Sequence, residues 1–427
     1  MTGSEPSTVL TPDFYHYPWR PLSTATIDGD FVKLTWADGY SLSAYSWWLR
    51  ESIVADGATD PNTRECTIDP ADFDDSLSVT DVELDTTGAL RVGFSDGFAG
   101  VLHPGWLHHV ATGTHRPGAV IPDPIAWTTQ TLSEPPTFNG AAVLGGDHNE
   151  LLSFLNAMVV HGLARLTDVP ARASGHRDSA IEGLVAVTDL IGVRRDTNFG
   201  PVWSVKAEIS GDFENSTANT GLRLGPHADL PTREIPPGFQ FLHCVANSVG
   251  GGWSRMTDGA ALVAHLEANE PDTFEALTSL DWVFFNRSRD HDHRWVGPMI
   301  DHGAPGSPLT IRAFYPVRGF PAMDSDDVPR AYRAAKRFHQ LGADPRFQIG
   351  YPFRPGDLVG FDNRRMLHGR DAFDPGGGVR HLRGTYVDHD EVYSRIRVLA
   401  RARVGSMVPS ATTSPDHSPS SQEVVAP

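Results

Sequence analysis

The feature of this sequence that most limits its fold is the division of its apolar residues into short runs by turn residues. Examples of such runs are Phe239–Val245, Leu309–Tyr315 and Asp357–Phe361. The chain contains 41 glycines and 33 prolines, which favour turns and interrupt helices. Many short strands separated by turns are typical of an antiparallel barrel or sandwich. We therefore predict a mainly β fold with a few covering helices.

Helical periodicity predicts where those helices lie. Leu152, Leu155 and Val159 fall on one helical face, and Gly162 marks the end of that helix. A second helix is predicted over residues 180–191, and a third over residues 327–341 with proline in its first turn.

The first hundred residues contain an internal echo. The segment Val32–Gly39 reads VKLTWADG and is followed by Trp48, whereas Val92–Gly97 reads VGFSDG and is followed by Trp106, which is 58 positions later (106 minus 48). Asp-Gly between apolar runs is a strong hairpin signal, because glycine accepts positive φ. We predict a small β-rich domain over residues 20–112, a second domain over residues 113–406 and a disordered tail over residues 407–427, which are rich in Ser, Pro and Thr.

Charge and cysteine content exclude several classes of protein. There are 35 Lys and Arg against 53 Asp and Glu, a net charge of −18, so neither nucleic acid nor an anionic membrane is an expected partner. Two cysteines cannot form a disulfide scaffold or a four-thiolate metal site. The sequence has no signal peptide and no apolar run of membrane-spanning length, so we expect a soluble cytoplasmic protein.

Two His-x-Asp motifs could supply metal ligands. In the first, His176 and Asp178 precede a predicted helix, and Asp178 is better explained as its N-cap. In the second, His227 and Asp229 lie in GPHADLP, where proline and glycine exclude a helix. In an extended segment, residues two apart point to the same face, so this imidazole and carboxylate can bind one metal ion.

Two further residues extend the second motif. His368 ends the apolar segment GDLVGFDNRRMLHGR, and two histidines with one carboxylate are the ligand set of non-haem Fe(II) oxygenases. Arg380 follows 12 residues later, and a guanidinium can bind the distal carboxylate of 2-oxoglutarate bidentately. Each signal is weak alone. Surface histidines would explain the ligand motif equally well, and a surface ion pair would explain Arg380.

Taken together, these segments resemble the gamma-butyrobetaine hydroxylase and trimethyllysine dioxygenase family, a branch of the taurine-dioxygenase-like 2-oxoglutarate oxygenases. The resemblance covers residues 30–405. It is carried by GPHADLP with PPGFQFLHC, by GGGWSRMTDG, by GDLVGFDNRRMLHGR with RHLRGTYVDHDEVYSRIRVL, and by VKLTWADGYSLSAYSWWLRE near the N-terminus.

The resemblance implies a double-stranded β-helix, or jelly-roll, catalytic domain and, as is common in that family, a homodimer. It implies Fe(II) at His227, Asp229 and His368, with 2-oxoglutarate anchored by Arg380 and O2 as the second cosubstrate. The expected reaction is hydroxylation of an unactivated C–H bond of a small molecule, with release of succinate and CO2. The alternatives are desaturation or cyclisation at the same iron, and a non-catalytic jelly-roll protein that binds small molecules.

Two departures from the family pattern concern zinc and substrate. Members of the family often bind zinc in the leading domain, but Trp48–Asp56 contains no cysteine and Phe98 stands where a histidine is expected, so we predict no zinc site. Phe199, Trp203 and Tyr386 match positions of the substrate pocket, whereas Asn219 replaces a usual tyrosine. For Phe199, ordinary core packing is as good an explanation as a pocket role. We predict a substrate other than butyrobetaine.

Overall fold

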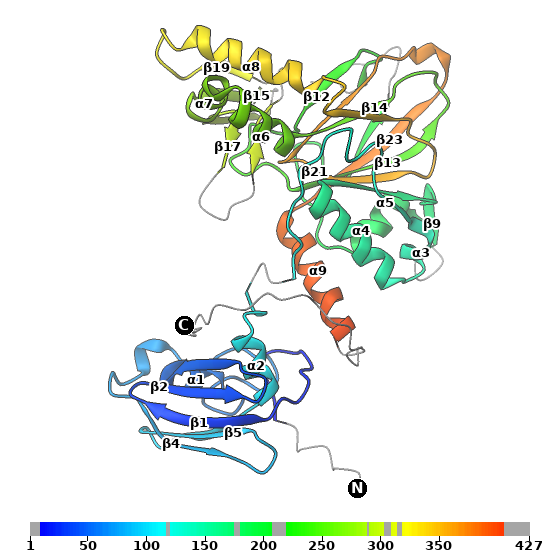
Figure 1. Ribbon diagram of the computed structural model, residues 1–427. Helices are drawn as coiled ribbons and strands as arrows, with labels where there is room; N and C mark the ends of the chain where they lie inside the picture. The colour runs from blue at the N-terminus through cyan, green and yellow to red at the C-terminus, as the bar shows by residue number, and fades with distance from the viewer. Residues whose placement is uncertain are drawn as a thin grey trace. The chain divides into compact units, whose positions relative to one another are not determined.

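The structure is a computed structural model that describes residues 9–116, 120–174, 180–206, 219–287, 290–302, 309–313 and 318–404. The chain divides into two compact units, residues 1–120 with 400–427 and residues 121–399 (Figure 1). The predicted tail at residues 407–427, together with His176 and Asp178, lies outside the described residues. In the described part, no helix has both the length and the apolar character needed to cross a bilayer.

The described part of the first unit consists of two similar halves, which correspond to the internal echo of the sequence. Each half is a three-stranded antiparallel sheet followed by a helix. The elements of the first half are β1 (Leu22–Asp28), β2 (Phe31–Trp36), β3 (Ser41–Tyr45) and α1 (Ser46–Ser52). Those of the second half are β4 (Val79–Leu84), β5 (Leu90–Phe94), β6 (Ala99–Leu102) and α2 (Pro104–Ala111). The Asp-Gly turns connect β2 to β3 and β5 to β6, with positive φ at Gly39 and Gly97.

The repeated Trp-Leu pairs meet in the core of this unit. The rings of Trp48 and Trp106 stack with their centroids 5.2 Å apart. The following residues, Leu49 and Leu107, are completely buried in one apolar cluster. The echo therefore reflects a packing requirement, in which each half contributes one leucine and one indole to a shared core.

Arg50 lies in the segment Trp48–Asp56, where members of the resembled family often have zinc ligands. Its Nε lies 2.9 Å from a carboxylate oxygen of Asp96, and its Nη1 donates to the carbonyl of Gly57 at 3.0 Å. The guanidinium carbon also lies 3.5 Å from the centre of the Phe98 ring, a close cation–π contact. A buried arginine thus ties the helix α1 to the second hairpin turn.

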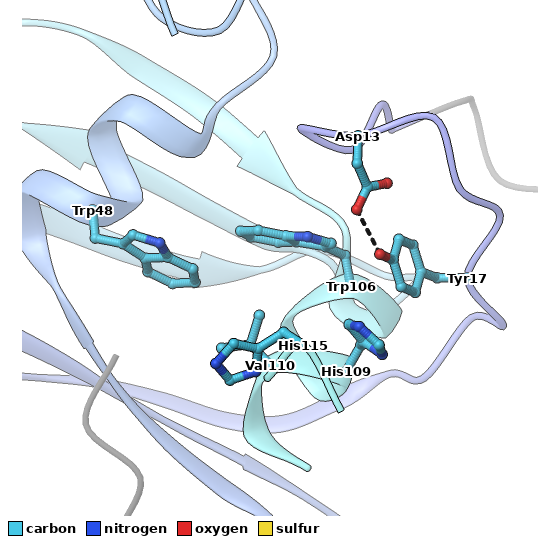
Figure 2. Close-up of a pocket in the computed structure, with 7 residues that line it drawn as sticks. All are labelled: Asp13, Tyr17, Trp48, Trp106, His109, Val110 and His115. Carbon is cyan, nitrogen blue, oxygen red and sulfur yellow. Dashed lines mark hydrogen bonds between the residues drawn. The ribbon is translucent and has the colours of Figure 1, made fainter. Parts of the chain in front are cut away.

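A cavity of about 290 Å³ opens beside the stacked indoles (Figure 2). Asp13 accepts a hydrogen bond from the hydroxyl of Tyr17 at 2.5 Å on one side of it. The other lining residues are Trp48, Trp106, His109, Val110 and His115. None of the site residues predicted from the sequence lines this cavity.

The described strands of the second unit form two main sheets. The larger has the order β11-β23-β13-β21-β8-β7, and the smaller has the order β12-β22-β14-β20. The larger sheet consists of β7 (Thr137–Asn139), β8 (Leu163–Thr167), β11 (Trp203–Lys206), β13 (Phe239–Asn247), β21 (Leu358–Asp362) and β23 (Arg380–Val387). The smaller consists of β12 (Leu224–His227), β14 (Ser254–Asp258), β20 (Gln348–Tyr351) and β22 (Met366–Arg370). All pairings are antiparallel except β7 with β8.

The two sheets pack against each other through one apolar cluster. Leu242, Phe361 and Leu382 enter it from the larger sheet, and Met256 and Ile349 enter it from the smaller sheet. Because strands alternate their side chains, the inner faces of both sheets supply this cluster. The mainly β architecture predicted from the sequence is confirmed.

Helices and small sheets cover the two main sheets. Figure 1 shows α3, α4 and α5 near one another and α6, α7 and α8 in a second group. Their bounds, with that of the C-terminal helix, are α3 (Gly140–Leu144), α4 (His148–His161), α5 (Gly183–Asp189), α6 (Gly259–Asn269), α7 (Pro271–Ser279), α8 (Val328–Gly342) and α9 (His389–Val404). The small sheets are β9 (Arg172–Ser174) with β10 (Ala180–Glu182), β15 (Trp282–Arg287) with β16 (Asp292–Gly297) and β19 (Arg318–Pro321), and β17 (Ile300–Asp301) with β18 (Thr310–Ile311).

The predicted helices are present, with one correction. The first ends at Gly162, which adopts the left-handed conformation, and the third begins at Val328 with proline in its first turn. The second was predicted over residues 180–191, but Ala180–Glu182 instead pair with β9, and the helix begins at Gly183. The proposed N-cap role of Asp178 was therefore wrong, since Glu182 precedes the first helical residue.

Candidate metal centre

His227 and His368 face each other across two hydrogen-bonded strands. His227 is the last residue of β12, and the register pairs it with His368 in β22. Directly opposed residues of an antiparallel pair project to the same side, so the imidazole centroids lie only 4.1 Å apart. The Nδ1 of His227 lies 2.9 Å from the carbonyl of Gly225, to which it can only donate. That bond fixes the orientation of the ring and leaves Nε2 as the nitrogen that faces Asp229 and could bind a metal ion.

Asp229 lies beside the two histidines through a backbone conformation that the sequence did not predict. We expected residues 227–229 to be extended, but β12 ends at His227, and the chain bends at Asp229. Leu230 then adopts φ 53°, which is uncommon for a residue with a side chain. The carboxylate nevertheless lies between the imidazoles, with one oxygen 3.4 Å from Nε2 of His227 and the other 3.9 Å from Nε2 of His368.

The three side chains fit a divalent metal ion. One potential ligand atom from each of His227, Asp229 and His368 lies within 4.8 Å of the others. Two imidazole nitrogens and one carboxylate oxygen are the donors that non-haem iron prefers, and three ligands leave other coordination positions free. His227 is 2% exposed, so solvent has little access to this side of the site.

The electrostatics of the site favour the protonation states that a metal requires. Burial raises the pKa of Asp229, but the adjacent His368 and the hydrogen bond with His227 outweigh it and hold the pKa well below its ordinary value. Burial, together with His227, lowers the pKa of His368 to about 3. At neutral pH the carboxylate is therefore ionised and His368 is neutral, as metal ligands must be.

Tyr386 contacts the same carboxylate from the opposite sheet. It lies in β23 and is 2% exposed, and its hydroxyl donates to Asp229 at 2.9 Å. Burial and the charge of Asp229 raise its pKa well above the ordinary value, so it remains a donor at neutral pH. The sequence assigned Tyr386 to the substrate pocket, which stays a prediction, and it did not predict the bond from the Tyr386 hydroxyl to Asp229.

Trp203 lies beside Tyr386 on the neighbouring strand β11. The ring centroids are 5.6 Å apart and tilted by 42°. The indole lies across Gly384, where a Cβ atom would come within 2.2 Å of the ring. Phe199 lies in the loop before β11 with 40% of its surface exposed, and Asn219 accepts a long hydrogen bond from the backbone of Lys206 at 3.4 Å. Trp203 and Tyr386 are thus in contact beside the metal ligands.

Arg380 is a buried cation at the start of β23. It is 6% exposed, its Nε has no hydrogen-bond partner, and among the described residues it forms no ion pair with an acidic side chain. Burial lowers its pKa to about 10, which still leaves it charged at neutral pH. A buried guanidinium without an acidic partner is unfavourable unless an anion binds to it.

Arg370 is a second buried guanidinium that sequence reasoning missed. Arg370 and Arg380 lie over the ring of Phe373, with guanidinium carbons 5.0 and 5.4 Å from its centre. Burial and the charge of Arg380 lower the pKa of Arg370 to about 10. Arg370 follows His368 by two residues in β22, so their side chains share a face about 6.6 Å apart along the strand. This places Arg370 on the same strand face as His368.

Asn363 is another functional candidate that the sequence did not single out. It lies in the turn between β21 and β22 and is completely buried. Its side chain bonds both the amide and the carbonyl of Asp229. The motif GDLVGFDNRRMLHGR contained the residue, but no local pattern links it to a position 134 residues earlier.

Known proteins share these segments. Residues 129–386 match the Taurine catabolism dioxygenase TauD, TfdA family. The chain is 36% identical over 393 residues to the gamma-butyrobetaine dioxygenase of Pseudomonas sp. (strain AK-1), a match covering 91% of this chain and 99% of that protein. It is 25% identical over 407 residues to the mitochondrial trimethyllysine dioxygenase of Gallus gallus, covering 93% of each.

A search of solved structures gives more distant matches. The crystal structure of asparagine oxygenase in complex with Fe(II), 2S,3S-3-hydroxyasparagine and succinate superposes with a TM-score of 0.44 at 18% sequence identity. That match covers 57% of this chain and 79% of the oxygenase.

Proposed function

The chain belongs to the TauD and TfdA family of dioxygenases and is thus an Fe(II)- and 2-oxoglutarate-dependent dioxygenase, and we propose that His227, Asp229 and His368 hold its iron. The observation that carries this assignment is the convergence of their three ligand atoms within 4.8 Å. We also propose that the two packed sheets are the double-stranded β-helix of a catalytic domain spanning residues 113–406.

We propose that Arg380 binds the distal carboxylate of 2-oxoglutarate. Its burial and its lack of an acidic partner among the described residues support this role. The neighbouring Arg370 adds positive potential while its own Nη2 is held by the carbonyls of Thr220 and Leu222 at 2.6 and 2.9 Å. A dianionic keto acid would offset the repulsion between the two guanidiniums.

The chain's own residues prepare the site for this chemistry. When bound, Fe(II), O2 and 2-oxoglutarate supply an oxidation that converts the keto acid to succinate and CO2 and places oxygen on the substrate. The hydrogen bond from His227 to Gly225 fixes one imidazole, and Tyr386 directs the carboxylate of Asp229. The apolar cluster between the sheets limits the access of water.

The substrate is proposed to be a small molecule whose reacting C–H bond lies beside Trp203 and Tyr386. Phe199 and Asn219 are proposed as more distant parts of the pocket wall. Gamma-butyrobetaine and trimethyllysine are the first compounds to test, because relatives are named for them. A homodimer remains a prediction, which analytical ultracentrifugation can decide.

A succinate-release assay with Fe(II), ascorbate and 2-oxoglutarate tests the metal assignment. Asp229→Ala should abolish succinate formation, whereas Asp178→Ala, in the other His-x-Asp motif, should retain it. If both variants form succinate at the parent rate, the assignment is wrong. Product mass distinguishes hydroxylation, which adds one oxygen, from desaturation, which removes two hydrogens.

A further inference from the structure

The turn that follows β21 is joined to the segment that follows Asp229 by buried polar side chains. The Oδ1 of Asn363 accepts a hydrogen bond from the amide of Asp229 at 2.7 Å, and its Nδ2 donates to the carbonyl of Asp229 at 3.0 Å. The same Nδ2 lies 3.3 Å from the carbonyl of Pro237, and the backbone amide of Asn363 donates to Gly238 at 2.8 Å. One carboxamide therefore satisfies both backbone groups of Asp229.

Asp229 needs this support because it has left the strand. Beyond His227 the strand pairing of β12 stops, so strand hydrogen bonds no longer fix the backbone of Asp229. The next residue, Leu230, is in the left-handed region, a conformation that persists only where surrounding contacts determine it. The carboxamide of Asn363 takes the place of a neighbouring strand at this point.

Further contacts hold the rest of the segment but do not reach Asp229. The Nε of Arg364 donates to the carbonyl of Pro236 at 2.9 Å, and Arg312 donates to the carbonyl of Pro231 at 2.8 Å. Tyr386 bonds the carboxylate of Asp229 but leaves its backbone untouched. Among the described residues, Asn363 is thus the side chain whose hydrogen bonds fix the main-chain position of this ligand.

Asn363 is also close in sequence to His368. It lies in the turn that connects β21 of the larger sheet to β22 of the smaller sheet, and His368 is near the middle of β22. The pairing of β12 with β22 places His227 directly opposite His368. All three proposed ligands are therefore positioned from one segment, two through the register of β22 and one through the turn that precedes it.

We propose that Asn363 is a positioning residue that sets the place of Asp229 relative to the two histidines and thereby sets the affinity of the site for its metal. This inference rests on the proposed assignment of the three ligands. Substitution of residues that orient metal ligands typically weakens metal binding about 10- to 100-fold. We expect a loss of that size when the carboxamide is removed.

The test is a metal titration of Asn363→Ala with Mn(II) and with Co(II) alone, in the absence of turnover. The Mn(II) dissociation constant should rise about 10- to 100-fold. The Co(II) absorption spectrum should change as well, because a displaced Asp229 alters the ligand geometry. Asn363→Asp retains the side-chain volume and the oxygen that accepts from Asp229, so it should bind Mn(II) with an affinity between those of the parent and Asn363→Ala.

Asn139→Ala is the matched control. Asn139 also uses its carboxamide oxygen to accept a backbone hydrogen bond, from Ala142 at 2.9 Å at the start of α3, and its loss removes a helix cap. Both alanine variants should melt at lower temperature than the parent without metal, but only Asn363→Ala should lose Mn(II) affinity. Equal loss in both variants would reduce the effect to general destabilisation and overturn the proposal.

Asp229→Ala tests the ligand assignment separately from the positioning role of Asn363. If it binds Mn(II) as the parent does, the ligand assignment itself fails. If it loses Mn(II) while Asn363→Ala stays within threefold of the parent, the assignment stands and the positioning role is refuted. Should Asn363→Ala fail to fold, parent-like Mn(II) affinity and Co(II) spectrum in Asn363→Asp would refute it equally.

Discussion

Replacing Arg380 by methionine should weaken the binding of 2-oxoglutarate without lowering the stability of the protein. The pKa of Arg380 falls to about 10, roughly 2.5 below that of a solvated guanidinium, and at about 1.4 kcal/mol per pKa unit burial of the charge costs about 3 kcal/mol. Methionine fills much of the same space without that cost. The variant without ligands should therefore be as stable as the parent or more stable. Its affinity for 2-oxoglutarate should fall by at least 2 kcal/mol, or about 30-fold, as a buried charge pair is lost.

Calorimetry on the Mn(II)-loaded protein measures both quantities, the binding of 2-oxoglutarate and the melting temperature. Arg383→Met is the matched control, because Arg383 lies on the same strand but is paired with Glu182 at 2.9 Å. That variant should lose up to about 1 kcal/mol of stability and keep its affinity for 2-oxoglutarate. An Arg380→Met variant that binds 2-oxoglutarate within threefold of the parent would refute the assigned role, whatever its stability.

Two further predictions concern the packing of Trp203 and the reactivity of the two cysteines. In Gly384→Ala the new Cβ would come within 2.2 Å of the Trp203 ring, so the indole must move. We expect the variant to lose about 1–3 kcal/mol of stability and to show altered tryptophan fluorescence. An unchanged melting temperature would contradict this packing. Burial raises the pKa of the Cys244 thiol to about 12, whereas Cys66 is exposed. Iodoacetamide at pH 8.5 should therefore alkylate Cys66 and leave Cys244 unmodified. Peptide mass spectrometry can verify this.

The sequence predicted those features that follow from local pattern. The Asp-Gly turns of the echo predicted hairpins, which the structure has between β2 and β3 and between β5 and β6. The mainly β character followed from the short apolar runs. His227 and His368 were singled out individually, but their direct opposition across a strand pair was not predicted, since register depends on contacts between segments distant in sequence.

The features that the sequence missed are hydrogen bonds between distant segments. The bond from the Tyr386 hydroxyl to Asp229, which lies 157 positions away, was not predicted, and the pocket role of Tyr386 stays a prediction. The expectation that residues 227–229 are extended failed because Leu230 turns the chain, and the carboxamide that stabilises this turn comes from Asn363. No periodicity records such a pair. Likewise, the start of α5 was predicted too early, because Ala180–Glu182 form a strand that pairs with β9.

The distribution of buried charge argues against a non-catalytic binding protein. Asp229 is a carboxylate enclosed by two imidazoles, and close by lie Arg370 and Arg380, two guanidiniums that repel each other. In a protein that bound neither a metal nor an anion, the burial of the Asp229 carboxylate and of the Arg380 guanidinium would each cost desolvation energy that an ion of opposite charge could offset. A cation beside Asp229 and a dianion beside Arg380 would offset both costs together. The pair that an iron- and 2-oxoglutarate-dependent enzyme binds, a divalent metal and a dicarboxylic keto acid, has these two charges.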